Sequence, residues 1–169
     1  MQGRIETHQG FTLVELLIVV IILATLAAIV VPQFGSTTAD ATETAFQANR
    51  AALSRAIETY RQQHNGVYPG AAPALGGSCV NGNALGASSP NDGFKLQLEN
   101  YTDVAGRVCS GYDPDFFRFG PYLRGGVPEN PYGGSSDVTV LSDGELGLFP
   151  DESGGWMFDS ITGELIGNG

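Results

Sequence analysis

The sequence has few basic side chains. Eight Lys or Arg residues stand against eighteen Asp or Glu residues in a chain of 169, and the formal net charge is −10 at pH 7. Lys95 is the only lysine. Proteins that bind nucleic acids by themselves neutralise phosphates with a basic face. The composition therefore argues against autonomous binding of DNA or RNA, and we expect no nucleic acid among the partners.

Residues suited to catalysis are also scarce. The chain has two histidines and two cysteines, and His64 is the only histidine after the first ten residues. The sequence contains no G-x-S-x-G nucleophile motif, phosphate-binding loop or paired-carboxylate motif. We therefore predict that the protein is not an enzyme.

Glycine and proline are nearly missing from the first part of the chain. Of 24 glycines, 21 lie after Asn65, and so do eight of the nine prolines. This change in composition divides the chain into four segments. They are a leader (1–10), an apolar helix (11–31), an amphipathic helix (32–64) and a Gly-rich globular domain (65–169).

The apolar segment, residues 11–31, carries a single charge at Glu15. As a helix it would be about 32 Å long, which matches the bilayer hydrocarbon. A secretory signal peptide has a shorter apolar stretch, and a buried core helix would be unusual beside so small a domain. We therefore predict a single membrane span. Arg4 precedes it and the next basic residue is Arg50, so the positive-inside rule places the N-terminus in the cytoplasm and the C-terminal domain outside.

Glu15 is unusual because a carboxylate inside a membrane span is costly. Two interpretations remain open. Lying near the start of the span, Glu15 could simply reach the lipid headgroups. Alternatively, it could pair with a cation within an assembly.

The start of the chain resembles a known signal. The leader M-Q-G-R-I-E-T-H-Q-G, followed by F-T-L-V-E-L-L-I-V-V, is similar to the class III signal of type IV pilins and of the pseudopilins of type II secretion. The resemblance implies cleavage between Gly10 and Phe11 by a prepilin peptidase, which also N-methylates Phe11. It further implies that Glu15 pairs with the methylated amine of a neighbouring subunit. Subunits of this family polymerise with themselves and with other pilin-like subunits, on an inner-membrane platform protein.

Pro32 lies where many members of this family have a proline that disrupts the helix. The resemblance therefore implies a helix break at Pro32, because proline removes one backbone donor and clashes with the preceding turn. A proline that merely ends the span at the interface is an equal alternative.

The amphipathic segment shows helical spacing. Small or apolar residues recur every three or four positions, which predicts one stripe that packs on the globular domain. Asn65 and Gly66 both tolerate the left-handed conformation and predict the end of the helix. The predicted stripe comprises Thr38, Ala41, Ala45, Ala48, Ala52, Leu53, Ala56, Ile57 and Tyr60.

The Gly-rich domain is expected to be a small antiparallel sheet. Residues 70–93 read as a loop. Residues 94–98 alternate as a strand does, although a short helix is also possible there. Residues 138–141 are rich in β-formers, and 155–158 with 164–166 read as a closing hairpin. The fold class is therefore α+β, with a long N-terminal helix packed on an antiparallel sheet, as in the pilin fold.

Two segments of the domain resemble the major pseudopilins of type II secretion. They are A-I-E-T-Y-R-Q-Q-H-N-G-V-Y-P-G and G-P-Y-L-R-G-G-V-P-E-N-P-Y-G, in which Asn130 and Tyr132 replace the usual Asp and Trp. This resemblance implies a pseudopilin that acts in protein export, anchored in the bacterial inner membrane with a periplasmic domain. The alternative is a major or minor type IV pilin in adhesion, motility or DNA uptake.

Cys79 and Cys109 are the two cysteines. In an extracytoplasmic domain they most simply form one disulfide. Two free buried thiols are the alternative.

The end of the chain is strongly acidic. No basic residue follows Arg124, whereas eight acidic residues do. Major pseudopilins hold calcium in an acidic loop near this region, and Asp143, Glu145, Asp151 and Glu152 could supply hard oxygen ligands. A solvated acidic face that keeps the protein soluble is the alternative.

Overall fold

The computed structural model describes residues 11–72, 74–76, 78–144 and 147–168, without the side chains of residues 29–37. The chain divides into two compact units, Met1–Ala41 and Thr42–Gly169. The helix α1, Leu13–Gln63, runs through both units. The predicted leader, residues 1–10, lies outside the described residues.

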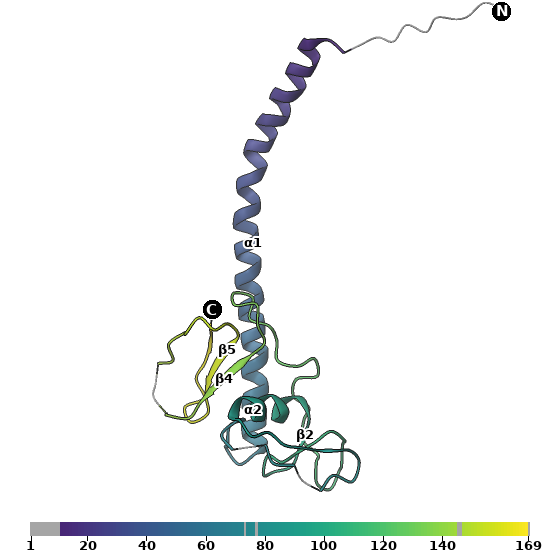
Figure 1. The fold of residues 1–169 in the computed structure, drawn as a ribbon, viewed down its shortest axis with the longest axis vertical. Coiled ribbons are helices and arrows are strands. Elements are labelled where there is room, and N and C mark those ends of the chain that lie inside the picture. The colour runs from purple at the N-terminus through teal and green to yellow at the C-terminus, as the bar shows by residue number, and fades with distance from the viewer. Residues whose placement is uncertain (1–10, 73, 77, 145–146, 169) are drawn as a thin grey trace, which may run out of the picture. The chain divides into compact units, whose positions relative to one another are not determined.

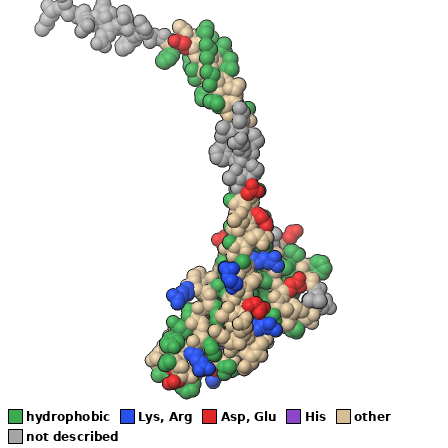
Figure 2. All heavy atoms as spheres, turned by 180° about the vertical axis from the view of Figure 1, so that it is seen from behind, with side chains coloured by type: hydrophobic (Ala, Val, Ile, Leu, Met, Phe, Trp, Pro, Cys, Tyr) green, Lys and Arg blue, Asp and Glu red, His purple; other side chains and the backbone are tan. Residues whose placement is uncertain are grey.

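The N-terminal unit contains the first part of α1 (Figure 1). All of its described side chains from Phe11 to Ala28 are exposed, and they form a largely hydrophobic surface (Figure 2). No helix within the described residues combines the length and the apolar character that crossing a membrane requires. The predicted span over 11–31 includes side chains outside the described residues, and it stays a prediction.

The C-terminal end of α1 is built as the sequence predicts. Asn65 has φ 57° and Gly66 has φ 83°, both left-handed. The Gly66 N–H donates to the carbonyl of Arg61 at 2.9 Å, a bond that closes a helix end of the Schellman type. The chain therefore leaves the helix just after Gln63.

The buried stripe of α1 agrees with the prediction only in its second half. Leu53, Ala56, Ile57 and Tyr60 are buried. In the first half the predicted stripe is wrong, because its alanines are exposed, whereas Phe46 packs against the core. The stripe continues from Leu53 through Phe46 in a register shifted by one residue, since the large ring buries far more apolar area than alanine does. The exposed alanines are Ala41, Ala45 and Ala48.

A second helix, α2 (Pro90–Glu99), covers the stretch that also read as a strand. Ser89 caps its N-terminus, because its Oγ accepts the N–H of Asp92 at 3.1 Å. Pro90 occupies the first helical turn, where its missing N–H costs nothing. Of the two alternatives for residues 94–98, the short helix is confirmed.

The strands form two small sheets instead of one antiparallel sheet. In the first, β1 (Ala84–Leu85), β3 (Val108–Cys109) and β2 (Tyr101–Thr102) lie in that order and are antiparallel. In the second, β5 (Trp156–Asp159) pairs in parallel with β4 (Val138–Leu141) and antiparallel with β6 (Leu165–Gly167). The α+β class and the closing β5–β6 hairpin are confirmed. The expectation of a purely antiparallel sheet is wrong.

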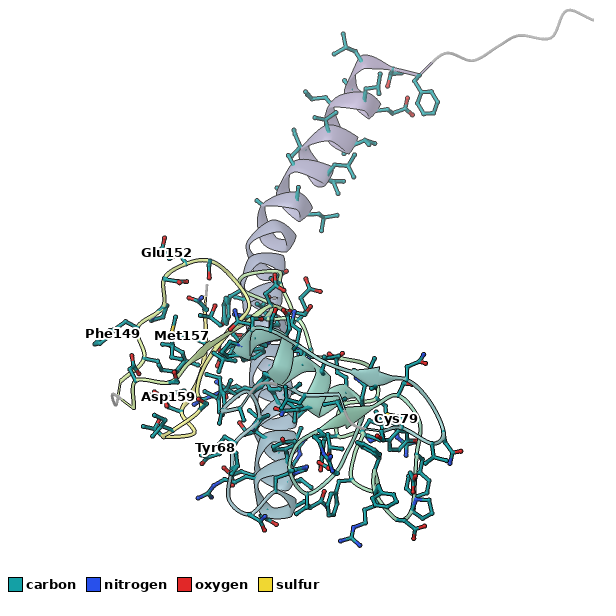
Figure 3. The ribbon with its side chains drawn as sticks, turned by 60° about the horizontal axis from the view of Figure 1, so that its bottom comes forward. Tyr68, Cys79, Phe149, Glu152, Met157 and Asp159 are labelled. Atoms are coloured by element: carbon teal, nitrogen blue, oxygen red, sulfur yellow. A yellow bond between two sulfur atoms is a disulfide. The ribbon has the colours of Figure 1, made fainter. Side chains whose placement is uncertain are left out.

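A disulfide joins Cys79 to Cys109, with 5.9 Å between the Cα atoms. The predicted disulfide is therefore confirmed. It connects the long loop before β1 to β3, and Cys79 is labelled in Figure 3.

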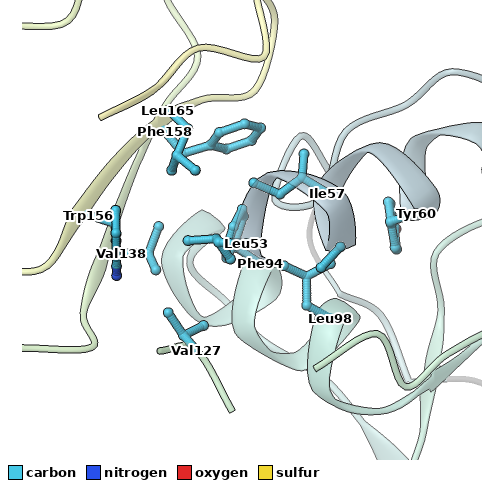
Figure 4. Packing of buried hydrophobic residues seen from close by; sticks show 11 residues of the cluster. Leu53, Ile57, Tyr60, Phe94, Leu98, Val127, Val138, Trp156, Phe158 and Leu165 are labelled. Atoms are coloured by element: carbon cyan, nitrogen blue, oxygen red, sulfur yellow. The ribbon is translucent and has the colours of Figure 1, made fainter. Parts of the chain in front are cut away.

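The core of the C-terminal unit lies where α1, α2 and the second sheet meet (Figure 4). Leu53 and Ile57 of α1 face Phe94 and Leu98 of α2 and the strand residue Phe158. Trp156 is fully buried and its Nε1 donates to the carbonyl of Pro128 at 2.7 Å. The acidic β5–β6 region is thereby fixed to the same core as α1.

Candidate functional site

The first candidate site is the start of α1. Gly10 lies outside the described residues, so the predicted cleavage site is described only from Phe11 onward. Phe11 is exposed, and Thr12 and Glu15 follow it on the first turn.

Thr12 and Glu15 form a capping box. Glu15 Oε2 accepts the backbone N–H of Thr12 at 2.9 Å and its hydroxyl at 2.8 Å. In return, Thr12 Oγ1 accepts the backbone N–H of Glu15 at 3.3 Å. Thr12 is the N-cap and Glu15 is the third helical residue, so the pair satisfies donors that a helix start leaves free. Glu15 is thus hydrogen-bonded within its own chain.

The capping box leaves part of the carboxylate available. Both contacts from Thr12 go to Oε2, and no described residue donates a hydrogen bond to Oε1. The site can therefore present one carboxylate oxygen, one helical turn from Phe11, to a cation outside the chain. Sequence reasoning singled out Glu15 but missed Thr12, although the spacing T-x-x-E is the signature of a capping box.

Apolar side chains surround this carboxylate. The large hydrophobic residues of α1 from Leu13 to Leu23 and Leu26 are each at least half exposed. Isolated soluble proteins rarely expose so large an apolar surface, and such surfaces mark contacts with membranes or other proteins. The start of α1 therefore suits an apolar environment in which an unpaired carboxylate needs a partner.

Pro32 lies within α1, which is assigned as one helix from Leu13 to Gln63. The side chains around it lie outside the described residues. The helix break predicted at Pro32 stays a prediction.

The second candidate site is the acidic loop after β4. Glu145 lies outside the described residues. Among the described residues, no three Asp, Glu, His or Cys side chains lie close enough together to hold a metal ion. Asp151 Oδ1 accepts the Asn168 amide at 2.6 Å and the Ser153 N–H at 3.0 Å, and Glu152 is exposed with φ 60°. Hydrogen bonds from Ser153 and then Asn168 lower the pKa of Asp151.

Two other carboxylates organise this loop, and sequence reasoning missed both. Buried Asp159 accepts the N–H groups of Ile161 at 2.7 Å, Thr162 at 2.9 Å and Gly144 at 3.2 Å. Burial raises the pKa of Asp159, but these backbone bonds outweigh it and lower the pKa overall.

Glu164 Oε2 accepts the N–H groups of Gly147 at 2.8 Å and Leu148 at 3.2 Å. In the part of the loop that is described, carboxylates thus bind the backbone.

A family model described as the prokaryotic N-terminal methylation motif matches residues 7–31. No curated protein matches the chain significantly, and no solved structure does. The match contains the capping box and the apolar start of α1. It supports a type IV pilin-like protein with a class III signal, processed by a prepilin peptidase and assembled into pilin-like filaments.

Proposed function

We propose that the chain is a non-enzymatic structural subunit of a pilus-like filament. It is inserted in the inner membrane as a precursor with a single span over residues 11–31. It is cut between Gly10 and Phe11, methylated at Phe11, and polymerised through its N-terminal helix. The match of residues 7–31 to the methylation motif carries this proposal, supported by a carboxylate at the start of an exposed apolar helix.

Glu15 pairs with the methylated amine of Phe11 on a neighbouring subunit. In the apolar surroundings of the filament neither charge has water, and removing one partner of such a pair is strongly unfavourable. The capping box keeps the carboxylate at the helix start, near the height of its own amine. The pairing would therefore fix the axial register of successive subunits.

Glu15→Gln separates the charge from the cap. Glutamine retains an oxygen that caps the helix, but it cannot neutralise an amine. We expect this variant to be processed normally and to yield few or no filaments in a quantitative shearing assay. Thr12→Ser is the matched control, because it retains both hydroxyl bonds and should assemble. Wild-type amounts of filament from Glu15→Gln would contradict the pairing role.

Processing is tested on the protein itself. Mass spectrometry of the assembled subunit should find an N-methylated Phe11 as the first residue. An intact Met1 on the assembled protein would refute the proposal.

A pseudopilin of type II secretion is the favoured subclass, because two segments of the domain resemble the major pseudopilins. In this role a short periplasmic filament, built with the inner-membrane platform protein, helps export proteins. Deleting the gene should then leave exported enzymes in the periplasm and surface pili unaffected. The alternative, a type IV pilus subunit, predicts the opposite pair of outcomes.

Calcium binding by the acidic loop is a separate proposal. The proposed oxygen ligands are Asp143, Glu145, Asp151 and Glu152, together with backbone carbonyls. Calcium should then raise the melting temperature of the purified chain, and Glu145→Gln should abolish the rise. An unchanged melting temperature across a calcium titration would remove this proposal.

A further inference from the structure

The C-terminal unit holds an aromatic ring out in solvent. Phe149 is 83% exposed, more than any other large hydrophobic residue of this unit within the described residues. Figure 3 shows it pointing away from the strands. An exposed ring of this kind is a candidate anchor for a protein contact.

The backbone on both sides of Phe149 is fixed by side chains of the β6 region. Before it, Glu164 accepts the N–H groups of Gly147 and Leu148. After it, the Asp151 N–H donates to Asn168 Oδ1 at 2.7 Å, and the Asn168 amide donates back to Asp151 at 2.6 Å. The ring is therefore presented by a preorganised loop, which reduces the entropy lost on binding.

Acidic groups accompany this ring. Phe149 is followed by Pro150, Asp151 and Glu152, and the 45 residues after Arg124 carry eight acidic and no basic side chains. Glu152 is exposed and makes no hydrogen bond or ion pair with the described part of the chain. The Phe149 loop, residues 147–152, thus combines an apolar anchor with negative charge.

A groove of about 390 Å³ lies beside α1 in the same unit. An apolar cavity of about 150 Å³ suffices to bind benzene, so the groove has room for a phenylalanine ring and part of its neighbours. Its apolar surface comes from two alanines of the helix and from the loop after β3. The groove is lined by Ala52, Arg55, Ala56, Thr59, Tyr122 and Leu123.

The groove carries positive charge with which no acidic residue of the described part of the chain pairs. No described acidic residue forms a salt bridge with the guanidinium of Arg55, and the same holds for Arg124 next to the groove residue Leu123. Lys and Arg side chains are visible over one face of this unit (Figure 2). Arginine also stacks on aromatic rings, so Arg55 suits both a phenylalanine and a carboxylate.

We infer that the Phe149 loop of one subunit docks in the groove beside α1 of a second copy of this chain. Phe149 lies on Ala52 and Ala56, and Glu152 pairs with Arg55. Loop and groove are different surfaces of the same unit, so the contact is head-to-tail when each loop docks on the next subunit along the filament. A head-to-tail contact builds an open-ended chain where its rotation does not close into a ring, which is the case in a filament.

This inference rests on the proposed function. A single loop in a groove buries far less than the roughly 1,200–2,000 Å² of a stable interface. The contact therefore operates in the filament, where the N-terminal helices hold the subunits together. Assembled filaments of the full chain are accordingly the sample to test.

Cross-linking tests the contact directly. Both native cysteines are in a disulfide, so introduced cysteines are the only free thiols. Thr59→Cys in the groove and Pro150→Cys in the loop leave Phe149, Arg55 and Glu152 intact. A short bis-maleimide should convert filaments of this double variant into a ladder of covalent dimers, trimers and longer chains.

The matched control pairs Pro150→Cys with Gln47→Cys, which lies about 120° around the helix and about 18 Å along it from Thr59.

A second measurement tests the anchor and the charge. When Phe149→Ala is added to the Thr59→Cys, Pro150→Cys double variant, it should reduce the ladder at least fivefold. Ile161→Ala, which truncates another exposed apolar residue of this region, should leave the ladder unchanged. Arg55→Glu should also reduce the ladder, and adding Glu152→Arg should restore it.

The outcomes separate this contact from the filament itself. Filaments that assemble with methylated Phe11 but give no more ladder than the Gln47→Cys control would overturn the contact and leave the proposed function standing. A ladder that survives both Phe149→Ala and Arg55→Glu would overturn the contact as well. Failure of the native chain to assemble or to be processed would instead overturn the proposed function, and the contact with it.

Discussion

His64 is buried at the end of α1 among aromatic rings. It stacks on Tyr60 with 3.7 Å between ring centroids, and Phe119 and Tyr122 meet it edge-on. Its Nδ1 lies 2.7 Å from the carbonyl of Tyr60, which can only accept, so Nδ1 carries the proton. In the neutral ring Nε2 then accepts from the hydroxyl of Thr102 at 3.0 Å. The environment therefore fits the neutral imidazole.

The pKa of His64 predicts a pH dependence of stability. Burial lowers the pKa below its usual 6.5, although the carbonyl of Tyr60 and the charge of Asp103 oppose this. A lowered folded-state pKa means that this stability is present above about pH 6.5 and is lost as the pH falls through the folded-state value. The free energy of unfolding of the full chain in detergent should therefore fall between pH 7.5 and 5.5 in urea titrations.

His64→Gln supplies the control for this pH dependence. The variant should be less stable at pH 7.5, but its free energy of unfolding should be nearly constant over the same range. Asp159 and Asp151 have lowered pKa values, so their contributions are lost only below about pH 4 and do not interfere. Equal slopes for the native chain and the variant would contradict the assignment to His64.

Asn130 is a fully buried polar residue with two backbone partners. Its Nδ2 donates to the carbonyl of Gly155 at 2.7 Å, and its Oδ1 accepts the N–H of Tyr132 at 3.1 Å. Asn130→Ala would leave both groups unpaired, which should lower the free energy of unfolding by about 1–3 kcal/mol. Asn49→Ala removes one exposed bond, to the carbonyl of Glu129, and should cost less. Equal losses in urea titrations would contradict this account.

At the scale of single elements, α2 depends on its cap. Ser89 Oγ accepts the N–H of Asp92, and Phe94 and Leu98 of this helix are core residues. Ser89→Ala should therefore lower the free energy of unfolding by about 1 kcal/mol, as loss of an N-cap commonly does. Ser89→Thr retains an accepting oxygen and is expected to stay within a few tenths of the native value. A loss of the same size in both variants would show that the cap is not responsible.

The elements that the sequence predicted well are those with strong local signals. The end of α1 follows from Asn65 and Gly66, whose left-handed conformation is a property of those residues. The closing hairpin follows from β-rich stretches on both sides of Thr162 and Gly163. The prediction of the buried stripe of α1 was wrong before Leu53. Alanines fit both the predicted register and the one shifted by a residue, and only the packing of Phe46 decides between the two.

Strand order was not accessible from the sequence. β4 and β5 pair in parallel from Val138 opposite Trp156 to Leu141 opposite Asp159. This pairing depends on contacts between segments far apart in the chain, which local patterns do not specify. The same limit applies to the bond that Asp159 accepts from Gly144 and to the bonds that Glu164 accepts, because these donors belong to another loop. Asp143, Asp151 and Glu152 were predicted as calcium ligands only because acidic residues are frequent in this part of the sequence.

At the scale of the whole molecule, the candidate sites of the two units differ in how far the sequence predicts them. The site at the start of α1 was predictable, because Phe11 and Glu15 belong to a short motif with fixed spacing. The groove and the Phe149 loop were not, because each combines residues brought together only by folding. Most of the net charge of −10 lies in the C-terminal unit, because eight acidic residues and no basic residue follow Arg124.

The disulfide connects the irregular segment between α1 and β1 to strand β3. Cys79 lies in the long loop, and Cys109 is buried in β3 opposite Ala84 of β1 and Tyr101 of β2. The bond closes a loop with a sequence separation of 30. Its main effect is to reduce the conformational entropy of the unfolded chain. For a loop of this size, this raises the free energy of unfolding by roughly 3.5 kcal/mol.

Reduction should therefore lower the stability of the whole C-terminal unit rather than unfold one loop. We expect dithiothreitol to lower the free energy of unfolding by about 3–4 kcal/mol in urea titrations. The double variant Cys79→Ser with Cys109→Ser should show the same loss without reductant, and adding reductant to it should change nothing. A local effect would instead appear as faster proteolysis between residues 78 and 109 with an unchanged urea midpoint. That result would contradict the prediction, because restriction of the unfolded state acts on every cooperative contact of the unit at once.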